Sequence, residues 1–240
     1  MTVVSWADVN REVLTELLPE ALVVLPVGAV EQHGPHLATG TDTFMAATVA
    51  QRAAERAEKE SSRPLVIAPV LPFGASDHHL PFGGTLSLTP ETLLAVLVDL
   101  LRSVAADGGR RVVLVNGHGG NVGICHAASA AAAARHEIAV AHVDYWRMAG
   151  PGTSPGHAGE FETSLVGAVR PELMGSAEPR DHVPEAAAID GVEVHDAGIW
   201  AAMDGFTDRP DRADRAAGEA RLDQIVDALA ERLVALAKTM

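Results

Sequence analysis

The sequence predicts an α/β fold, a three-layer α/β/α sandwich in which a mostly parallel sheet lies between two layers of helices. Short apolar runs alternate with longer amphipathic segments along most of the 240 residues, and this βαβα order is typical of such a sandwich. Residues 111–115, Arg-Val-Val-Leu-Val, form an apolar, β-branched run of the kind found in strands buried on both faces. Because this length fits one sizeable core and no repeat or long linker divides the chain, we expect a single domain over residues 1–240.

The individual elements follow from the spacing of the apolar residues. One helix start is marked clearly, because Thr89 is a good N-cap residue and Pro90 suits the first helical position. In chain order we expect a helix over 8–18, a strand over 21–27, a helix over 43–59, a strand over 65–71, a helix over 89–106, a strand over 111–115, a helix over 122–135, a strand over 138–145 and a closing helix over 219–238.

The loop after the strand over 21–27 concentrates carboxylates and imidazoles. Glycines and a proline keep this loop on irregular backbone rather than in a regular helix. Oxygen and nitrogen ligands together suit Zn, Mn or Fe, so the loop predicts a metal site, although a polar loop with incidental histidines is the alternative. The side chains concerned are Glu31, His33, His36 and Asp42.

The strand over 111–115 ends in a second polar segment, Asn116-Gly-His-Gly-Gly-Asn121. Its glycines permit tight turns around His118. Gly-rich turns after strands also cradle phosphate, but this one lacks the GxGxxG spacing and the Gly-Lys-Ser/Thr ending of nucleotide loops. A phosphate- or nucleotide-binding module is therefore the weaker interpretation.

A third segment, residues 157–164, reads His-Ala-Gly-Glu-Phe-Glu-Thr-Ser. Thr163 and Ser164 are suited to cap a helix that starts there. Glu162 then lies at or just before a helix N-terminus, where a negative charge is favoured. An ordinary capping cluster is the alternative, but it leaves His157 and Glu162 unexplained.

These polar segments are expected to meet in space. The loops that carry Glu31, Ser76 and His118 each follow a predicted strand. In open α/β sheets, ligands bind outside the carboxyl ends of the strands. The three loops therefore predict one site at that edge of the sheet.

The ordered segments resemble the creatininase family of metal-dependent amidohydrolases. The matching stretches are GAVEQHGPHLATGTD (28–42), PFGASDHHLPFGGTLSL (72–88), NGHGGN (116–121) and HAGEFETS (157–164). The resemblance implies an α/β sandwich that holds two adjacent divalent metal ions, Zn, Mn or Fe, at the strand ends. It also implies a homo-oligomer of the hexamer type.

Residue by residue, the resemblance assigns metal ligation to Glu31, His33, Asp42 and His118, with Asp42 as the bridging carboxylate. Creatinine-hydrolysing members have a further carboxylate ligand where this chain has Gly120. Glu162 is the candidate for that missing ligand.

Two further departures argue against creatinine as the substrate. Creatinine-hydrolysing members place an aromatic residue at the position of Gly119. They also bind creatinine with a Trp-Asp pair just before the position of His157, where this chain reads Gly-Thr-Ser-Pro over 152–155.

Catalytic roles are assigned to His157 and Glu162. His157 is available as a general acid or base, or as a group that orients the tetrahedral intermediate. The alternative is that it only supports a metal ligand through a hydrogen bond. Ser76 matches a substrate-contacting position of the family, and His78 and Gly119 complete the expected substrate-binding residues.

Composition limits the partners. The net charge of −14 disfavours nucleic acid and anionic membranes, which need basic patches. A single cysteine, Cys125, suits a reducing cytoplasm, and no apolar run approaches the roughly 18 to 20 residues of a membrane span. We therefore expect a cytoplasmic protein with a small-molecule amide substrate.

The leading hypothesis is an amidohydrolase that cleaves a cyclic or other amide C–N bond, excluding peptide bonds, with a water activated by two metal ions. One alternative is a peptidase-like maturation enzyme of a ribosomally made peptide cofactor of the mycofactocin type. Another is a non-catalytic metal- or ligand-binding module with the same fold.

Overall fold

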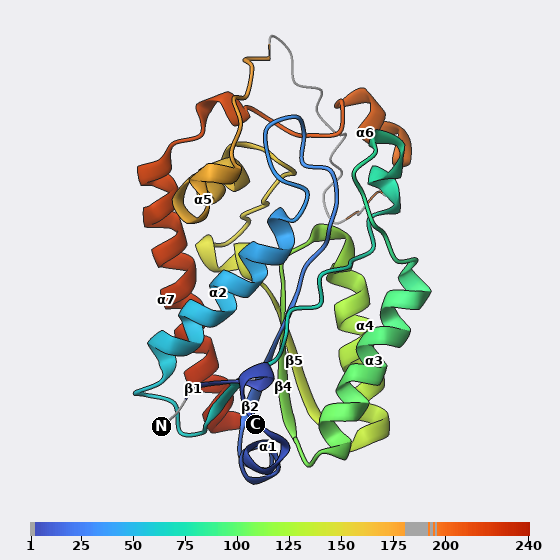
Figure 1. Ribbon diagram of the computed structural model, residues 1–240. Helices are drawn as coiled ribbons and strands as arrows, with labels where there is room; N and C mark the ends of the chain where they lie inside the picture. Colours follow the sequence, from blue (N-terminus) through green and yellow to red (C-terminus); the bar gives the residue numbers. More distant parts are fainter. Residues whose placement is uncertain (1–2, 181–191, 193, 195) are drawn as a thin grey trace.

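The computed structural model describes residues 3–180, 192, 194 and 196–240. Within this part of the chain, five parallel strands form one sheet with the order β1-β3-β2-β4-β5 (Figure 1). The strands are β1 (Val3–Ser5), β2 (Leu22–Val27), β3 (Leu65–Ile67), β4 (Arg111–Asn116) and β5 (Ala139–Asp144).

Helices cover both faces of the sheet (Figure 1). One layer contains α2 (Thr41–Ala57), α5 (Glu160–Val169) and α7 (Arg215–Thr239), and the other contains α3 (Pro90–Ala106) and α4 (Val122–His136). Helix α1 (Arg11–Leu17) lies at the end of the sheet where the strands begin, and α6 (Ala197–Ala202) lies near the opposite end. Short 3-10 helices occur at η1 (Trp6–Asp8), η2 (Asp77–Phe82), η3 (Gly119–Asn121), η4 (Tyr145–Ala149), η5 (Pro171–Leu173) and η6 (Pro210–Arg212).

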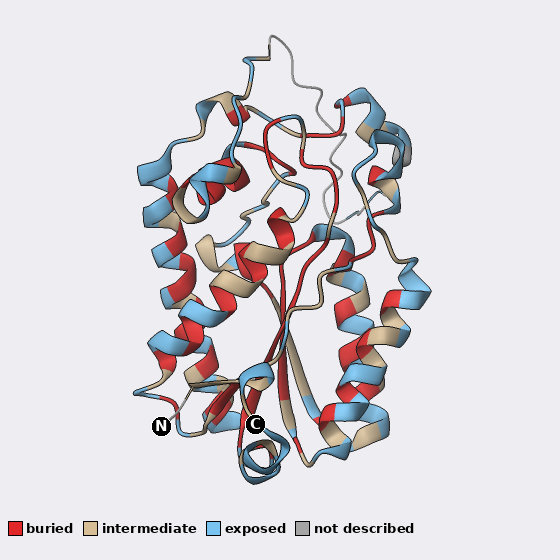
Figure 2. Cartoon of the chain, viewed as in Figure 1, coloured by how far each residue is buried: buried red, intermediate tan, exposed pale blue. Residues whose placement is uncertain are grey.

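Two hydrophobic cores hold these layers together. Successive side chains of a strand point to opposite faces, so Leu22 and Val24 pack in the core under α2 and α7, whereas Val23 and Leu25 pack under α3 and α4. Figure 2 shows the central strands buried and the outer faces of the helices exposed. The predicted α/β sandwich with a parallel sheet is therefore confirmed.

The predicted capping of α5 is wrong. The helix begins at Glu160, so Thr163 and Ser164 lie inside it, and Ser164 Oγ donates to the carbonyl oxygen of Glu160 (2.6 Å). The backbone N–H of Glu160 instead donates to Asp208 Oδ1 (2.8 Å). A cap supplied from a distant segment leaves no signal in the local sequence.

Other boundaries differ by a few residues. Helix α2 begins at Thr41, so Asp42 lies within its first turn, and β3 ends at Ile67, after which Leu71 makes only an isolated bridge to Val27. The short elements β1 and α6 were not predicted. No helix in the described ranges is long and apolar enough to cross a membrane.

Candidate metal centre

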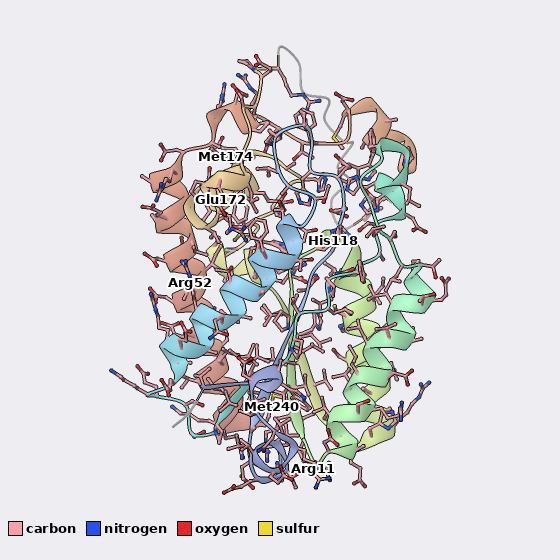
Figure 3. All side chains as sticks on the ribbon, in the orientation of Figure 1. Arg11, Arg52, His118, Glu172, Met174 and Met240 are labelled. Carbon is pink, nitrogen blue, oxygen red and sulfur yellow. The ribbon has the colours of Figure 1, made fainter. Side chains whose placement is uncertain are left out.

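The predicted site residues gather where the strands end. Figure 3 shows His118 at the carboxyl end of β4, beside the loop that follows β2 and the start of α2. Gly28 permits the close approach of this loop to α2, because a Cβ there would lie 2.5 Å from the Cα of Thr43. The approach brings Glu31 and Asp42, eleven positions apart in sequence, to the same imidazole, that of His118.

The carboxylate of Asp42 lies between two imidazoles. Its Oδ1 is 3.2 Å from His33 Nε2, and its Oδ2 is 3.2 Å from His118 Nδ1. One oxygen therefore faces each ring, which is the disposition that a carboxylate bridging two metal ions requires.

Each side of Asp42 has a second carboxylate. Glu31 Oε1 lies 3.2 Å from His118 Nδ1, and Glu162 Oε2 lies 3.8 Å from His33 Nε2. The structure thus divides the five predicted ligands into two groups that share Asp42. The group of His33, Asp42 and Glu162 has ligand atoms that all lie within 4.8 Å of one another.

Backbone carbonyls fix which nitrogen of each imidazole faces the centre. Because a carbonyl oxygen only accepts, His33 Nδ1 donates to the Glu31 carbonyl (3.1 Å), and His118 Nε2 donates to the Ala75 carbonyl (3.0 Å). In the neutral rings the opposite nitrogens, His33 Nε2 and His118 Nδ1, each keep a lone pair that faces the cluster and can bind a metal ion. Histidine ligands are usually oriented by such hydrogen bonds.

The carboxylates of the centre are buried and incompletely hydrogen-bonded. Glu31 is fully buried and Asp42 nearly so. Among the described residues, three carboxylate oxygens have no hydrogen-bond partner: Oε1 and Oε2 of Glu31 and Oδ2 of Asp42. Burying a carboxylate costs several kcal/mol unless a nearby positive charge offsets it. These oxygens and the two lone pairs therefore fit a site for divalent cations.

The electrostatics of the cluster also call for positive charge. Burial lowers the pKa of His33, but the surrounding carboxylates, Asp42 foremost, outweigh burial and raise it to about 10. Burial likewise opposes the charge on His118, yet Glu31 and Asp42 hold its pKa well above the ordinary value. The pKa of Asp42 is lowered because both imidazoles outweigh its burial. Without cations, protons on the imidazoles neutralise the carboxylates.

Glu162 is held by the start of α5. Its Oε2 accepts from the backbone N–H of Ala158 (2.5 Å), a residue with a φ of 49°. Positive φ at a non-glycine residue is uncommon and often marks functional sites. Burial raises the pKa of Glu162 to about 8, so in the absence of cations this carboxyl is protonated at neutral pH.

Gly120 has no room for a side chain. A Cβ at this position would overlap the carbonyl oxygen of Ala75 and lie 2.5 Å from His118 Nε2, the ring nitrogen that faces away from the cluster. The absence of a carboxylate at position 120 is therefore built into the packing, and Glu162 lies on the His33 side of the cluster.

His157 lies on the other side of Glu31. Its Nε2 donates to the Gln32 carbonyl (2.8 Å), and its Nδ1 lies 3.4 Å from Glu31 Oε1. Burial, with the neighbouring His33 and His79, lowers the pKa of His157 well below its ordinary value. The ring is thus neutral, with its unprotonated nitrogen directed toward the cluster.

The three expected substrate-binding residues differ in burial and in their position relative to His118. Ser76 is fully buried, and its hydroxyl lies 3.2 Å from His118 Nε2, behind the ring. His78 is half-buried and stacks on His118 with ring centroids 5.9 Å apart. Gly119 is exposed, and a Cβ there would meet open space.

Three residues outside the predicted catalytic, substrate-binding and metal-binding sets join the site. His79 stacks on His157 (4.0 Å between centroids), Trp200 of α6 packs edge-on against His79 (4.7 Å), and Gln32 contacts both histidines. The pair His78-His79 was the available signal for His79. Trp200 and Gln32 depend on contacts with distant segments and have no local pattern.

Fold and cluster together define an α/β protein with a candidate site for divalent metal ions at the carboxyl ends of its strands. The family model described as creatininase, creatinine amidohydrolase, matches residues 4–233. The chain belongs to the creatininase family, and the predicted membership is confirmed.

Relatives of known activity span several reactions. The chain is 40% identical over 151 residues to the mycofactocin precursor peptide peptidase of Mycolicibacterium smegmatis, a match that covers 63% of this chain and 59% of that protein. It is 30% identical to the creatinine amidohydrolase of Pseudomonas putida, with 75% of each protein covered. The match to the peptidase therefore spans less than two thirds of that relative's length.

Solved creatininase structures share the fold. A crystal structure of creatinine amidohydrolase superposes with a TM-score of 0.79 at 29% identity, covering 95% of this chain and 96% of that one. A structure described as creatininase Mn gives a TM-score of 0.79 at 28% identity, covering 96% and 97%.

Proposed function

We propose that this protein is an amidohydrolase that cleaves an amide C–N bond with the help of two divalent ions, Zn, Mn or Fe. The observation that carries the proposal is the carboxylate of Asp42, whose two oxygens face two separate imidazoles at 3.2 Å. Four buried ligand side chains around the shared carboxylate of Asp42 leave positions open for water and substrate, as catalytic sites require.

The residues of the centre divide into two sets of ligands. His33, Glu162 and one oxygen of Asp42 would hold one ion, and His118, Glu31 and the other oxygen of Asp42 would hold the second. Two bound divalent ions supply a water of lowered pKa and polarise the amide carbonyl. A phosphate-binding role has little support, because Glu31 and Asp42 lie against His118 and would repel phosphate.

His157 would act as the proton acceptor and donor of the reaction. Its Nδ1 carries no proton and faces Glu31, while Nε2 is held by a backbone carbonyl. A neutral imidazole of this kind takes up a proton from water and gives it to the leaving nitrogen. Glu162, 3.8 Å from His33, would take part as a metal ligand. Its carboxyl is protonated without ions and would lose the proton when an ion binds.

We propose a small-molecule amide other than creatinine as the substrate. The absence of an aromatic residue at Gly119 and of a Trp-Asp pair before His157 supports this choice. The second candidate is hydrolysis of a peptide bond in a ribosomally made peptide, and the 40% identity to mycofactocin precursor peptide peptidases favours it.

A substrate screen tests the proposal. Protein reconstituted separately with Zn, Mn or Fe is incubated with creatinine, lactams, formamides and short peptides, and product formation is measured by mass spectrometry. We expect hydrolysis of a lactam or formamide that is lost in Asp42→Ala and kept in Asp223→Ala, an exposed aspartate of α7. Cleavage of peptides alone would establish the second candidate, and no hydrolysis with any metal would contradict both.

A further inference from the structure

Gln32 joins two imidazoles of the site to the segment that follows α6. Its Nε2 lies 2.8 Å from His79 Nδ1 and 2.5 Å from the carbonyl oxygen of Gly205, and its backbone carbonyl accepts from His157 Nε2. The side chain is buried, and its partners come from segments that are distant in sequence.

Two backbone groups fix the orientation of the Gln32 amide. The backbone N–H of Gly34 donates to Oε1 (2.9 Å), so that atom is the oxygen. The carbonyl of Gly205 only accepts, so the atom facing it is the NH2 group. The second hydrogen of this NH2 group faces His79 Nδ1 (2.8 Å) and His157 Nε2 (3.2 Å). Because His157 Nε2 carries the proton that it donates to the Gln32 carbonyl, it has no lone pair to accept with, and His79 Nδ1 is the acceptor.

The protonation of both histidines follows. Because His79 Nδ1 accepts, its proton is on Nε2, which lies 3.7 Å from Glu31 Oε1. Because His157 Nε2 donates to the Gln32 carbonyl, its unprotonated Nδ1 faces the same oxygen at 3.4 Å. Both rings have the same tautomer, yet they present opposite ends, an N–H from one and a lone pair from the other.

We propose that Gln32 is a positioning residue, which sets the tautomers of His79 and His157 so that a hydrogen-bond donor and a proton acceptor face the metal centre side by side. The inference rests on the proposed amidohydrolase function. There, His79 Nε2–H donates a hydrogen bond to an oxygen of the bound substrate, and His157 Nδ1 takes the proton. The rings stack with centroids 4.0 Å apart, so the two groups reach neighbouring atoms of one ligand.

The test replaces the donor of Gln32 by an acceptor. In Gln32→Glu an oxygen faces His79 Nδ1, so the proton of His79 moves to Nδ1 or the ring becomes doubly protonated. The matched control is Gln51→Glu, which makes the same change at an exposed position of α2. Histidine tautomers are read from 15N NMR spectra of metal-free and zinc-loaded protein, with the His79 signals identified by their loss in His79→Phe.

We expect the parent and Gln51→Glu to show His79 protonated at Nε2 only, and Gln32→Glu to show a proton at Nδ1. In the zinc-loaded enzyme, kcat falls about 10- to 100-fold in Gln32→Glu, the usual effect of removing a residue that orients site groups, while KM changes less. His79 signals that are the same in parent and Gln32→Glu would overturn the proposal.

A second variant keeps the test decisive if Gln32→Glu does not fold. Gln32→Met has similar length and no donor, so His79 is expected to populate both tautomers, and a single unchanged tautomer would overturn the proposal. The spectra need no substrate. If the His79 tautomers are as expected but no substrate is hydrolysed, the proposed hydrolase function is contradicted. If a substrate is hydrolysed but the His79 tautomers differ from those expected, the proposed role of Gln32 is contradicted.

Discussion

At the scale of single residues, the charge on the imidazoles links cation binding to pH. In the metal-free protein the pKa of His33 is raised to about 10, that of His118 is raised well above its ordinary value, and that of Glu162 is raised to about 8. All three groups are therefore protonated at neutral pH. Cations compete with these protons for the same lone pairs.

We therefore predict that metal binding releases protons and tightens as pH rises from 6 to 8. Titration calorimetry with Zn in two buffers of different ionisation enthalpy measures the release, and repeating it across this pH range measures the affinity. In the metal-free protein the carboxylates around protonated His33, Asp42 foremost, raise its pKa to about 10 and so stabilise the fold. This contribution to the free energy of unfolding is fully present below the unfolded pKa of His33 and is lost as pH rises through about 10. Binding without proton release would contradict the proposed ligands.

The contrast between Gly119 and Gly120 gives a second prediction. Gly120→Ala forces a Cβ against the Ala75 carbonyl and His118, and we expect it to lower the free energy of unfolding by about 1–3 kcal/mol. Gly119→Ala is the matched control, because its Cβ meets open space and we expect a change within about 0.5 kcal/mol. Urea denaturation measures both, and equal effects would show that position 120 is not constrained as described.

At the scale of elements, the start of α5 positions Glu162. Asp208→Ala removes the acceptor of the Glu160 N–H, and we expect it to cost about 1 kcal/mol of stability and to weaken Zn binding. Asp214→Ala is the matched control, because Asp214 caps α7 in the same way through the Ala217 N–H (2.7 Å). It should cost similar stability in urea denaturation and leave Zn affinity unchanged in competition titrations. Equal losses of Zn affinity in the two variants would mean that the cap does not act through Glu162.

The elements that the sequence predicted well are those with strong local signals. The Thr89 hydroxyl accepts from the Thr92 N–H, and the helix runs to Ala106 as expected. The missed features depend on distant partners: Asp208 caps a helix 48 positions away, and Gln32 reaches Gly205 across 173 positions. The predicted ligands came from motifs, whereas the tautomers of the histidines required the three-dimensional structure.

At the scale of the whole molecule, the centre joins elements from different parts of the chain. Glu31 and His33 follow β2, and His118 follows β4. Asp42 lies in the first turn of α2, and Glu162 lies in the first turn of α5. Cations bound there tie these elements together in the folded state only. We predict that Zn at about 100 times its dissociation constant raises the free energy of unfolding by about 2.7 kcal/mol, measured by urea denaturation with and without chelator. An unfolding transition that chelation does not move would contradict this coupling.

The most direct test of the two-ion centre is metal content per protomer, measured by plasma mass spectrometry on protein purified without chelators or a metal-affinity tag. The proposed centre predicts close to two divalent ions in the parent and in Asp223→Ala, and loss of both in Asp42→Ala, because one carboxylate serves both positions. One ion would contradict the bridging role of Asp42. No ion in the parent, even after reconstitution with Zn, Mn or Fe, would contradict the metal centre itself.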